Sequence, residues 1–326
     1  MKIEYCTNRY EAADIWQACF PSDSVRFIQF YFQRVYRDED SLLLRNDSGD
    51  ACAYLGMLPF TMKFYHETVK SSYLSGVSTL PEHRNKGYMT ALVERALTEM
   101  YRRGDIVSTL IPARPDLYLR FGYRDCFFHH KQTVRGNGRP DKDISEKTDI
   151  ARMDSIFRKR FGVRPICLLR TEENWHTIIE EHRLFENGEI FMGNDAYAFV
   201  GVYQGKAVVK ELGCMNREAY HTMLEHILSM YHEVEVIEPY MDSPSRAPFA
   251  QARIINVKSA LSAATRANGQ TFCIKVKDPL IPENNGAFLA HDGIVETCND
   301  PCEELDIAGL TKRIFSDDGY MNLMLN

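Results

Sequence analysis

The stretch 73–102 constrains this chain more than any other part of it. Residues 73–79 are mostly apolar and predict a strand, and Pro81 ends that strand because proline lacks the N–H that a sheet ladder needs. A polar turn follows at 83–87. A helical period of apolar positions then begins, at Ala91, Leu92, Ala96, Leu97 and Met100. The stretch therefore predicts a strand, a polar turn and a helix in direct succession.

The polar turn has the chemistry of an anion site. The first N–H groups of a helix have no partner inside the helix and lie at the positive end of its dipole. Gly87 lets the backbone approach an anion closely, and Arg84 and Lys86 add positive charge. A pyrophosphate would suit such a turn. The alternative is an ordinary strand–turn–helix with a solvated basic turn, because short matches of this kind arise by chance.

The turn resembles motif A of the GNAT acyltransferases, R-x-x-G-x-G/A, which holds the pyrophosphate of coenzyme A. Met89 stands where that motif usually has a small residue. The resemblance implies that the cofactor is bound by Arg84, Asn85, Lys86, Gly87, Tyr88 and Met89. It also implies a bulge in the preceding strand, where the amides of Val77, Ser78 and Thr79 would pair with the pantetheine arm as an added strand does.

A second segment, 118–123, reads Tyr-Leu-Arg-Phe-Gly-Tyr and resembles the Y-x-x-F-G-[YF] motif after the fifth GNAT strand. In relatives this tyrosine protonates the departing thiolate of coenzyme A. A tyrosine, with an ordinary pKa of about 10, is still protonated where a carboxylic acid would be ionised. We therefore predict that Tyr118 is the general acid and that Phe121 and Tyr123 are packing residues. The alternative is that all three rings form an aromatic core cluster.

Two helices are predicted near the N-terminus, after a first strand within residues 1–7. The cluster 22–24, Ser-Asp-Ser, predicts the start of the second helix. This arrangement resembles the substrate-side wall of a GNAT domain, which implies that Asp23 binds an amine substrate. The alternative is that Asp23 only caps the helix, a position that aspartate favours.

At 326 residues the chain is too long for one ordinary domain. It resembles the enhanced intracellular survival family of acetyltransferases, which has a catalytic GNAT domain, a degenerate second one and a sterol-carrier-like tail. We predict an α+β fold, with a mixed central sheet and flanking helices in each GNAT lobe. The predicted domains are the catalytic GNAT domain, 1–135, the degenerate GNAT-like domain, 136–248, and the sterol-carrier-like domain, 249–326.

In that family the terminal carboxylate of the chain enters the active site as the base. The resemblance implies this role for Asn326, because residues 321–326 are apolar enough to be buried. The alternative is a final strand packed on the tail domain. A cationic amine must lose a proton before it attacks a thioester, so some base is required.

Composition argues against several classes of protein. A net charge of -6 argues against general nucleic-acid binding, which needs a basic face. The nine cysteines include no C-x-x-C pair, so we expect no metal site and scattered free thiols. No apolar run is long enough for a membrane span, and the polar start at Met1 predicts no signal peptide. A cytoplasmic location is expected.

We therefore predict an N-acetyltransferase that moves an acetyl group from acetyl-CoA to a primary amine by direct attack. The acceptor is a small molecule or a protein amine, and neither nucleic acid nor a membrane is an expected partner. The family resemblance implies a homo-oligomer, although no heptad or repeat in the chain indicates one. The alternatives are a lipid-binding protein whose working part is the tail, and a protein that binds coenzyme A without catalysis.

Overall fold

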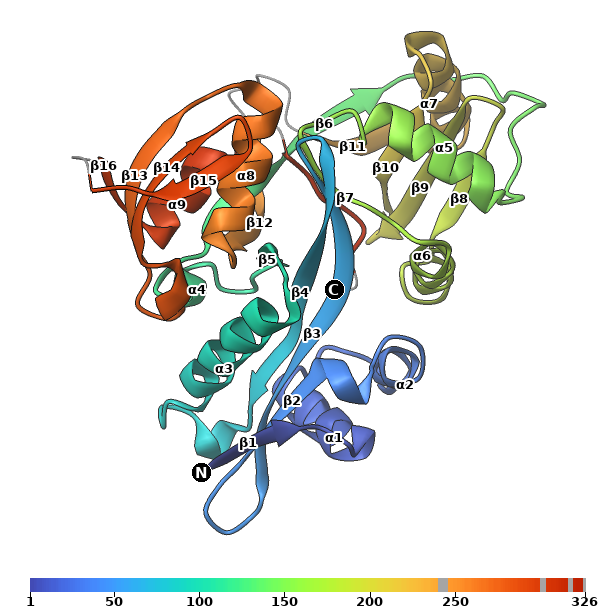
Figure 1. Ribbon diagram of the computed structural model, residues 1–326. Helices are drawn as coiled ribbons and strands as arrows, with labels where there is room; N and C mark the ends of the chain where they lie inside the picture. Colours follow the sequence, from blue (N-terminus) through green and yellow to red (C-terminus); the bar gives the residue numbers. More distant parts are fainter. Residues whose placement is uncertain (240–245, 300–302, 316–318, 325–326) are drawn as a thin grey trace. The chain divides into compact units, whose positions relative to one another are not determined.

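The structure is a computed structural model that describes residues 1–239, 246–299, 303–315 and 319–324 (Figure 1). The chain forms two compact units. The first comprises 1–125 and 250–316, and the second comprises 126–249 and 317–326. The predicted α+β class is confirmed, because both units combine sheets with helices. The three-domain division remains a prediction, and the two units differ from it: residues 250–315 group with 1–125, and residues 319–324 group with 126–249.

The main sheet of the first unit has the strand order β1-β2-β3-β4-β5-β12. Neighbouring strands are antiparallel except for β4 and β5, which are parallel. The strands are β1 (Lys2–Tyr5), β2 (Ser41–Arg45), β3 (Ala51–Phe64), β4 (Glu67–Thr79), β5 (Val107–Leu110) and β12 (Arg246–Ile254). The predicted strand that leads into the basic turn is thus confirmed as the last part of β4.

Helices cover both faces of this sheet. Figure 1 shows α3 on one side of β2, β3 and β4, with α1 and α2 on the other. The helices are α1 (Arg9–Cys19), α2 (Val25–Arg34), α3 (Tyr88–Arg103) and the one-turn α4 (Asp116–Leu119), with short 3₁₀ turns η1 (Asp38–Asp40) and η2 (Pro81–His83). The predicted stripe of α3 is buried at Leu92, Ala96, Leu97 and Met100, and Ala91 at its edge is half-buried.

A separate four-stranded sheet, in the order β15-β14-β13-β16, completes the first unit. Its strands are β13 (Phe272–Lys277), β14 (Gly286–His291), β15 (Ile294–Thr297) and β16 (Glu303–Asp306), with helices α8 (Val257–Asn268) and α9 (Ile307–Ile314) and the turn η3 (Pro282–Asn284).

Seven of the described cysteines are free thiols, but Cys273 is disulfide-bonded, so the expectation of free thiols is wrong for this residue.

The sheet of the second unit has the strand order β6-β11-β10-β9-β8, and a short pair, β7 with β17, lies off this path. The strands are β6 (Arg124–Arg135), β7 (Ile166–Leu168), β8 (Glu189–Met192), β9 (Ala196–Tyr203), β10 (Lys206–Cys214), β11 (Glu233–Pro239) and β17 (Gly319–Tyr320). The helices are α5 (Ile150–Arg160), α6 (Glu172–Phe185) and α7 (Arg217–Tyr231).

The two units repeat one plan. An antiparallel strand pair leads into a helix and then a parallel strand, as β3-β4-α3-β5 in the first unit and β9-β10-α7-β11 in the second. One end strand of each main sheet comes from elsewhere in the chain: β12 pairs with β5, whereas β6, which follows β5 in sequence, pairs with β11. This repetition supports the prediction of a second GNAT-like lobe.

Candidate functional site

The N-terminus of α3 is open. Its N-cap is Gly87, in the left-handed conformation with φ 79°, and neither a side-chain cap nor an acidic residue occupies the first turn. The surrounding basic side chains are exposed: Arg84 Nε donates to the Thr79 carbonyl at 3.3 Å, and Lys86 Nζ lies 3.4 Å from His83 Nδ1. The first amides of α3 are thus left free for an anion, with two cations beside them.

In the second unit, the N-terminus of the equivalent helix, α7, is capped by a side chain. Asn216 caps α7, and its side-chain oxygen accepts a hydrogen bond of 2.9 Å from the Ala219 amide. A capped helix start has fewer free donors, and no basic glycine turn precedes this one. Of the two repeated plans, only the first unit therefore has the chemistry expected for a pyrophosphate.

A bulge lies in β4, ahead of the turn. Tyr54 in β3 pairs with Ser78, but Gly56 pairs with Ser75, so β4 holds one extra residue over this interval. Gly76 within it has φ 61°, and a Cβ on this residue would be 2.3 Å from Cζ3 of Trp16. Only glycine fits both the conformation and the contact.

Beyond the bulge, one edge of β4 is open. Over the part of the chain that the structure describes, β5 pairs with β4 only at Ser71, Ser72 and Tyr73. Within the described residues, the buried hydroxyls of Ser78 and Thr79 have no hydrogen-bond partner. Leaving a buried hydroxyl without a partner costs about 1–3 kcal/mol. The amide-rich pantetheine arm of coenzyme A would satisfy such groups, so these residues fit that ligand.

Tyr118 lies on α4 and packs, half-buried, against the same core cluster as Val77, Tyr88 and Met89. Within the described residues its hydroxyl has no hydrogen-bond partner, and burial raises its pKa to about 12. Arg120 Nη2 donates to Thr90 Oγ1 at 2.8 Å, which ties this segment to the first turn of α3. The two motifs are thus brought together.

The other two aromatic residues of the second motif are buried. Phe121 lies in the core cluster, and the hydroxyl of Tyr123 lies 2.6 Å from Ser108 Oγ. Their predicted role as packing residues is confirmed. The ring of Tyr118 meets that of Tyr123 edge-on, with centroids 6.0 Å apart.

Asp23 does not cap α2. The cap is Ser24, whose side chain accepts from the Phe27 amide at 3.1 Å, so the capping alternative for Asp23 is wrong. Instead Asp23 Oδ2 accepts a hydrogen bond of 2.7 Å from Trp16 Nε1. Sequence reasoning missed Trp16, although it is one of only two tryptophans in the chain.

An aromatic cluster surrounds the bulge and this carboxylate. The ring of Trp16 lies 4.4 Å from that of Tyr31 and also contacts Phe32 and Tyr54. Tyr31 in turn donates to Ser75 Oγ at 3.0 Å, next to the bulge. The cluster therefore links a fixed carboxylate to the strand position where the reacting carbonyl of a bound thioester is expected.

Residues 7–126 match the family described as an acetyltransferase (GNAT) domain. This stretch therefore forms a GNAT acetyltransferase domain. No curated protein sequence matches the chain significantly.

Solved structures with the same fold cover nearly the whole chain. Eis1 from Mycobacterium abscessus is 19% identical, with a TM-score of 0.78, and a GCN5-related N-acetyltransferase from Anabaena variabilis is 16% identical, with a TM-score of 0.78. A protein of unknown function from Enterococcus faecalis, described as a probable N-acyltransferase, is 14% identical with a TM-score of 0.80. Each match covers 97% of this chain and 90% of the other. At these identities the likeness establishes the fold.

Within the GNAT domain, the structure brings together the basic turn, the bulge and Tyr118 in one unit. Asn326, the predicted base, lies outside the described residues. No group of three or more potential metal ligands occurs in the described parts of the chain. Among the described residues, no helix is both long and apolar enough to cross a membrane.

Proposed function

We propose that the protein is an acetyl-CoA-dependent N-acetyltransferase that acetylates a primary amine. The GNAT domain supports acyl transfer in general. The observation that carries the finer proposal is the uncapped start of α3. It adjoins a half-buried tyrosine and a bulged strand with two hydroxyls that have no partner among the described residues. Together they offer a pyrophosphate site, a pantetheine slot and an acid.

The proposed binding site for acetyl-CoA is formed by residues 77–79 and 84–89. The first amides of α3, with Arg84 and Lys86, would hold the pyrophosphate, while Asn85 and Gly87 take the left-handed conformations that form the turn. Tyr88 and Met89, the first two residues of α3, pack against the core cluster. Val77, Ser78 and Thr79 would face the pantetheine arm from the open edge of β4.

The proposed chemistry is a direct transfer. The acceptor nitrogen forms a bond to the acetyl carbon, and the carbon–sulfur bond of the thioester breaks. Tyr118 gives its proton to the departing sulfur, and backbone amides near Val77 stabilise the developing oxyanion. The proton lost by the amine goes to a base, for which the terminal carboxylate of Asn326 is our proposal, with a water chain as the alternative.

We also propose that Asp23 binds the ammonium form of the acceptor. Trp16 fixes its carboxylate, and the neighbouring rings favour a cation through their negative faces. The acceptor would be a small molecule or a protein amine. A cytoplasmic, homo-oligomeric protein with a sterol-carrier-like tail belongs to the same proposal.

Calorimetric titration of acetyl-CoA tests the proposal first. We expect saturable binding to the wild type and none to an Arg84→Ala, Gly87→Glu variant. A panel of amines, with free thiol as the product measured, then tests turnover. Binding without turnover of any amine would favour a protein that binds coenzyme A without catalysis. Absence of binding to either protein would contradict the proposal.

A further inference from the structure

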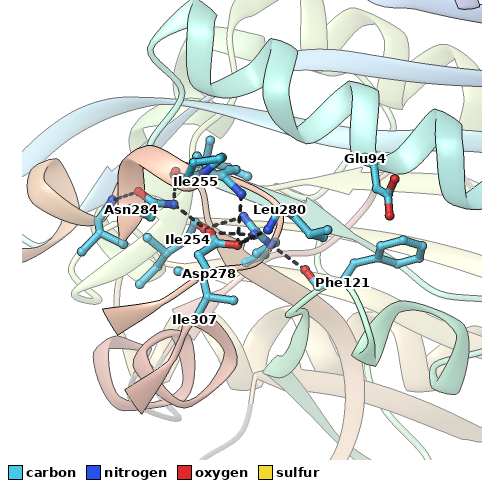
Figure 2. Close-up of polar contacts among 12 residues, drawn as sticks. Glu94, Phe121, Ile254, Ile255, Asp278, Leu280, Asn284 and Ile307 are labelled. Carbon is cyan, nitrogen blue, oxygen red and sulfur yellow. Dashed lines mark hydrogen bonds and ion pairs between the residues drawn. The ribbon is translucent and has the colours of Figure 1, made fainter. Parts of the chain in front are cut away.

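A buried ion pair from the C-terminal part of the first unit touches the Tyr118 segment. Arg253, in β12, is fully buried, and its Nη2 donates to both carboxylate oxygens of Asp278 at 2.7 and 2.8 Å. Its Nε donates to the carbonyl of Phe121 at 2.6 Å, and its Nη1 to the carbonyl of Ile254 at 3.0 Å. Figure 2 shows Asp278 and Phe121 on either side of these bonds.

Asp278 is itself held rigidly. Besides Arg253, it accepts hydrogen bonds from the amides of Leu280 and Ile281 and from the side chain of Asn284, at 3.0, 3.3 and 2.9 Å. Asn284 also donates to the Ile255 carbonyl at 2.9 Å, which returns the network to the end of β12 (Figure 2). The guanidinium therefore has a fixed support, and its bond to Phe121 has a fixed direction.

A second side chain of β12 holds the other end of the same segment. Gln251, two residues before Arg253 and on the same face of the strand, donates through Nε2 to the Pro115 carbonyl at 3.3 Å and to Asp125 Oδ1 at 3.0 Å. Pro115 precedes α4, and Phe121 follows it. The one-turn helix that carries Tyr118 is thus fixed at both ends by one strand.

The residue that Arg253 holds is also bonded directly to the backbone of Tyr118. The amide of Phe121 donates to the Tyr118 carbonyl at 3.0 Å, so Phe121 is held by Arg253 through its carbonyl and contacts Tyr118 through its amide. Next to it, Gly122 has φ 89°, and a Cβ there would be 2.7 Å from Ile307 and 3.2 Å from Arg253 Nε. The hydroxyl of Tyr118 has no partner among the described residues, so the position of the ring depends on this backbone and on its packing against Tyr123.

We propose that Arg253, supported by Asp278 and assisted by Gln251, is a positioning residue for the general acid Tyr118. The proposal rests on the function proposed above. It gives the C-terminal part of the first unit a role in the reaction: it holds the acid at the reacting sulfur. A buried ion pair adds little net stability but can fix one arrangement of the groups around it.

Arg253→Lys tests the proposal in the full chain. Lysine keeps a charge for Asp278 but lacks the planar fork that reaches Phe121 at the same time. We expect kcat to fall about tenfold, because a displaced acid transfers its proton poorly, while KM for acetyl-CoA stays within about twofold. Arg103→Lys is the matched control, since Arg103 pairs with Asp40 at 2.8 Å in the same unit and touches neither motif.

A double-mutant cycle separates positioning from general damage. In a Tyr118→Phe background, Arg253→Lys is expected to cause no further loss of kcat, because the acid is already absent. Equal losses in both backgrounds would overturn the proposal. Gln251→Met removes the hydrogen-bond donor without removing a charge. It is also expected to lower kcat in the wild-type background and not in the Tyr118→Phe background, and it replaces Arg253→Lys in the cycle if that variant folds poorly.

A spectroscopic readout does not depend on turnover. Fluorotyrosine placed only at position 118 gives one ¹⁹F signal, which Arg253→Lys is expected to shift or broaden and Arg103→Lys to leave unchanged. An unchanged signal in folded Arg253→Lys would overturn the positioning role. A shifted signal in a protein that acetylates no amine would count against the proposed function alone.

Discussion

Gly87 and Gly104 stand at opposite ends of α3 in almost the same backbone conformation, with φ values of 79° and 80°. At neither residue would an added Cβ lie within 4 Å of a heavy atom in the described parts of the chain. The two glycines therefore lie at opposite ends of the helix but have nearly the same local backbone strain. Substituting each in turn separates the contribution of the basic turn from that of helix stability.

We predict that Gly87→Ala and Gly104→Ala each destabilise the protein by about 1 kcal/mol, because both force a left-handed conformation on a residue with a Cβ. Only Gly87→Ala should also weaken acetyl-CoA binding, since its methyl group lies where the phosphates are expected to approach. Thermal unfolding and calorimetry check the two parts. Equal weakening of binding by both variants would mean that helix stability, and not the turn, controls affinity.

Tyr118→Phe should lower kcat about 100-fold, because general acid catalysis commonly contributes that much. Acetyl-CoA affinity should change little, since the hydroxyl has no partner among the described residues. Tyr123→Phe is the control: its hydroxyl is buried against Ser108, so this change should cost stability, about 1 kcal/mol, and leave kcat nearly intact. Wild-type turnover in Tyr118→Phe would remove it as the acid.

Burial raises the pKa of Tyr118 to about 12, which leads to a pH prediction. The tyrosine stays protonated throughout the usual assay range, so kcat, which reports the bound complex, should rise with pH as the bound amine loses its proton and show no falling limb up to about pH 10.5. A tyrosine with its ordinary pKa near 10 would instead give a falling limb there. A fall that Tyr118→Phe abolishes would contradict the raised pKa.

Much of the first unit could be predicted because its signals are local. The apolar period of α3, the turn between β2 and β3 and the strand ahead of Pro81 are each encoded within a few neighbouring residues. Element boundaries are harder to predict: α6 begins at Glu172 because Thr171 and Asn174 form a capping box before it.

Contacts between distant segments could not be predicted. Arg253 reads in the sequence as one more surface cation, yet it is fully buried against a carboxylate 25 residues away. The exchange that pairs β12 with β5 and β6 with β11 has no local signature either. Trp16 becomes part of the candidate site only through its contact with Gly76, which requires the packed structure.

In the second unit, His129 links stability to pH. Its ring stacks on Phe249 with centroids 3.9 Å apart, its Nε2 lies 3.4 Å from the Met321 carbonyl, and burial lowers its pKa to about 4. In the unfolded chain a histidine titrates near 6.5, so between these values the unfolded state binds the proton and the folded state does not. This contribution is complete above about pH 6.5 and is lost as the pH falls towards 4.

We predict that His129→Gln, which cannot take up a proton, reduces this acid sensitivity. Between pH 7.5 and 5 the wild type should lose about 2 kcal/mol more of its unfolding free energy than the variant does, as the two pKa values require. Urea unfolding across this range measures the difference. The exposed His176 provides the control, because His176→Gln should leave the acid sensitivity unchanged. Equal acid sensitivity in His129→Gln and the wild type would mean that His129 is already charged in the folded protein.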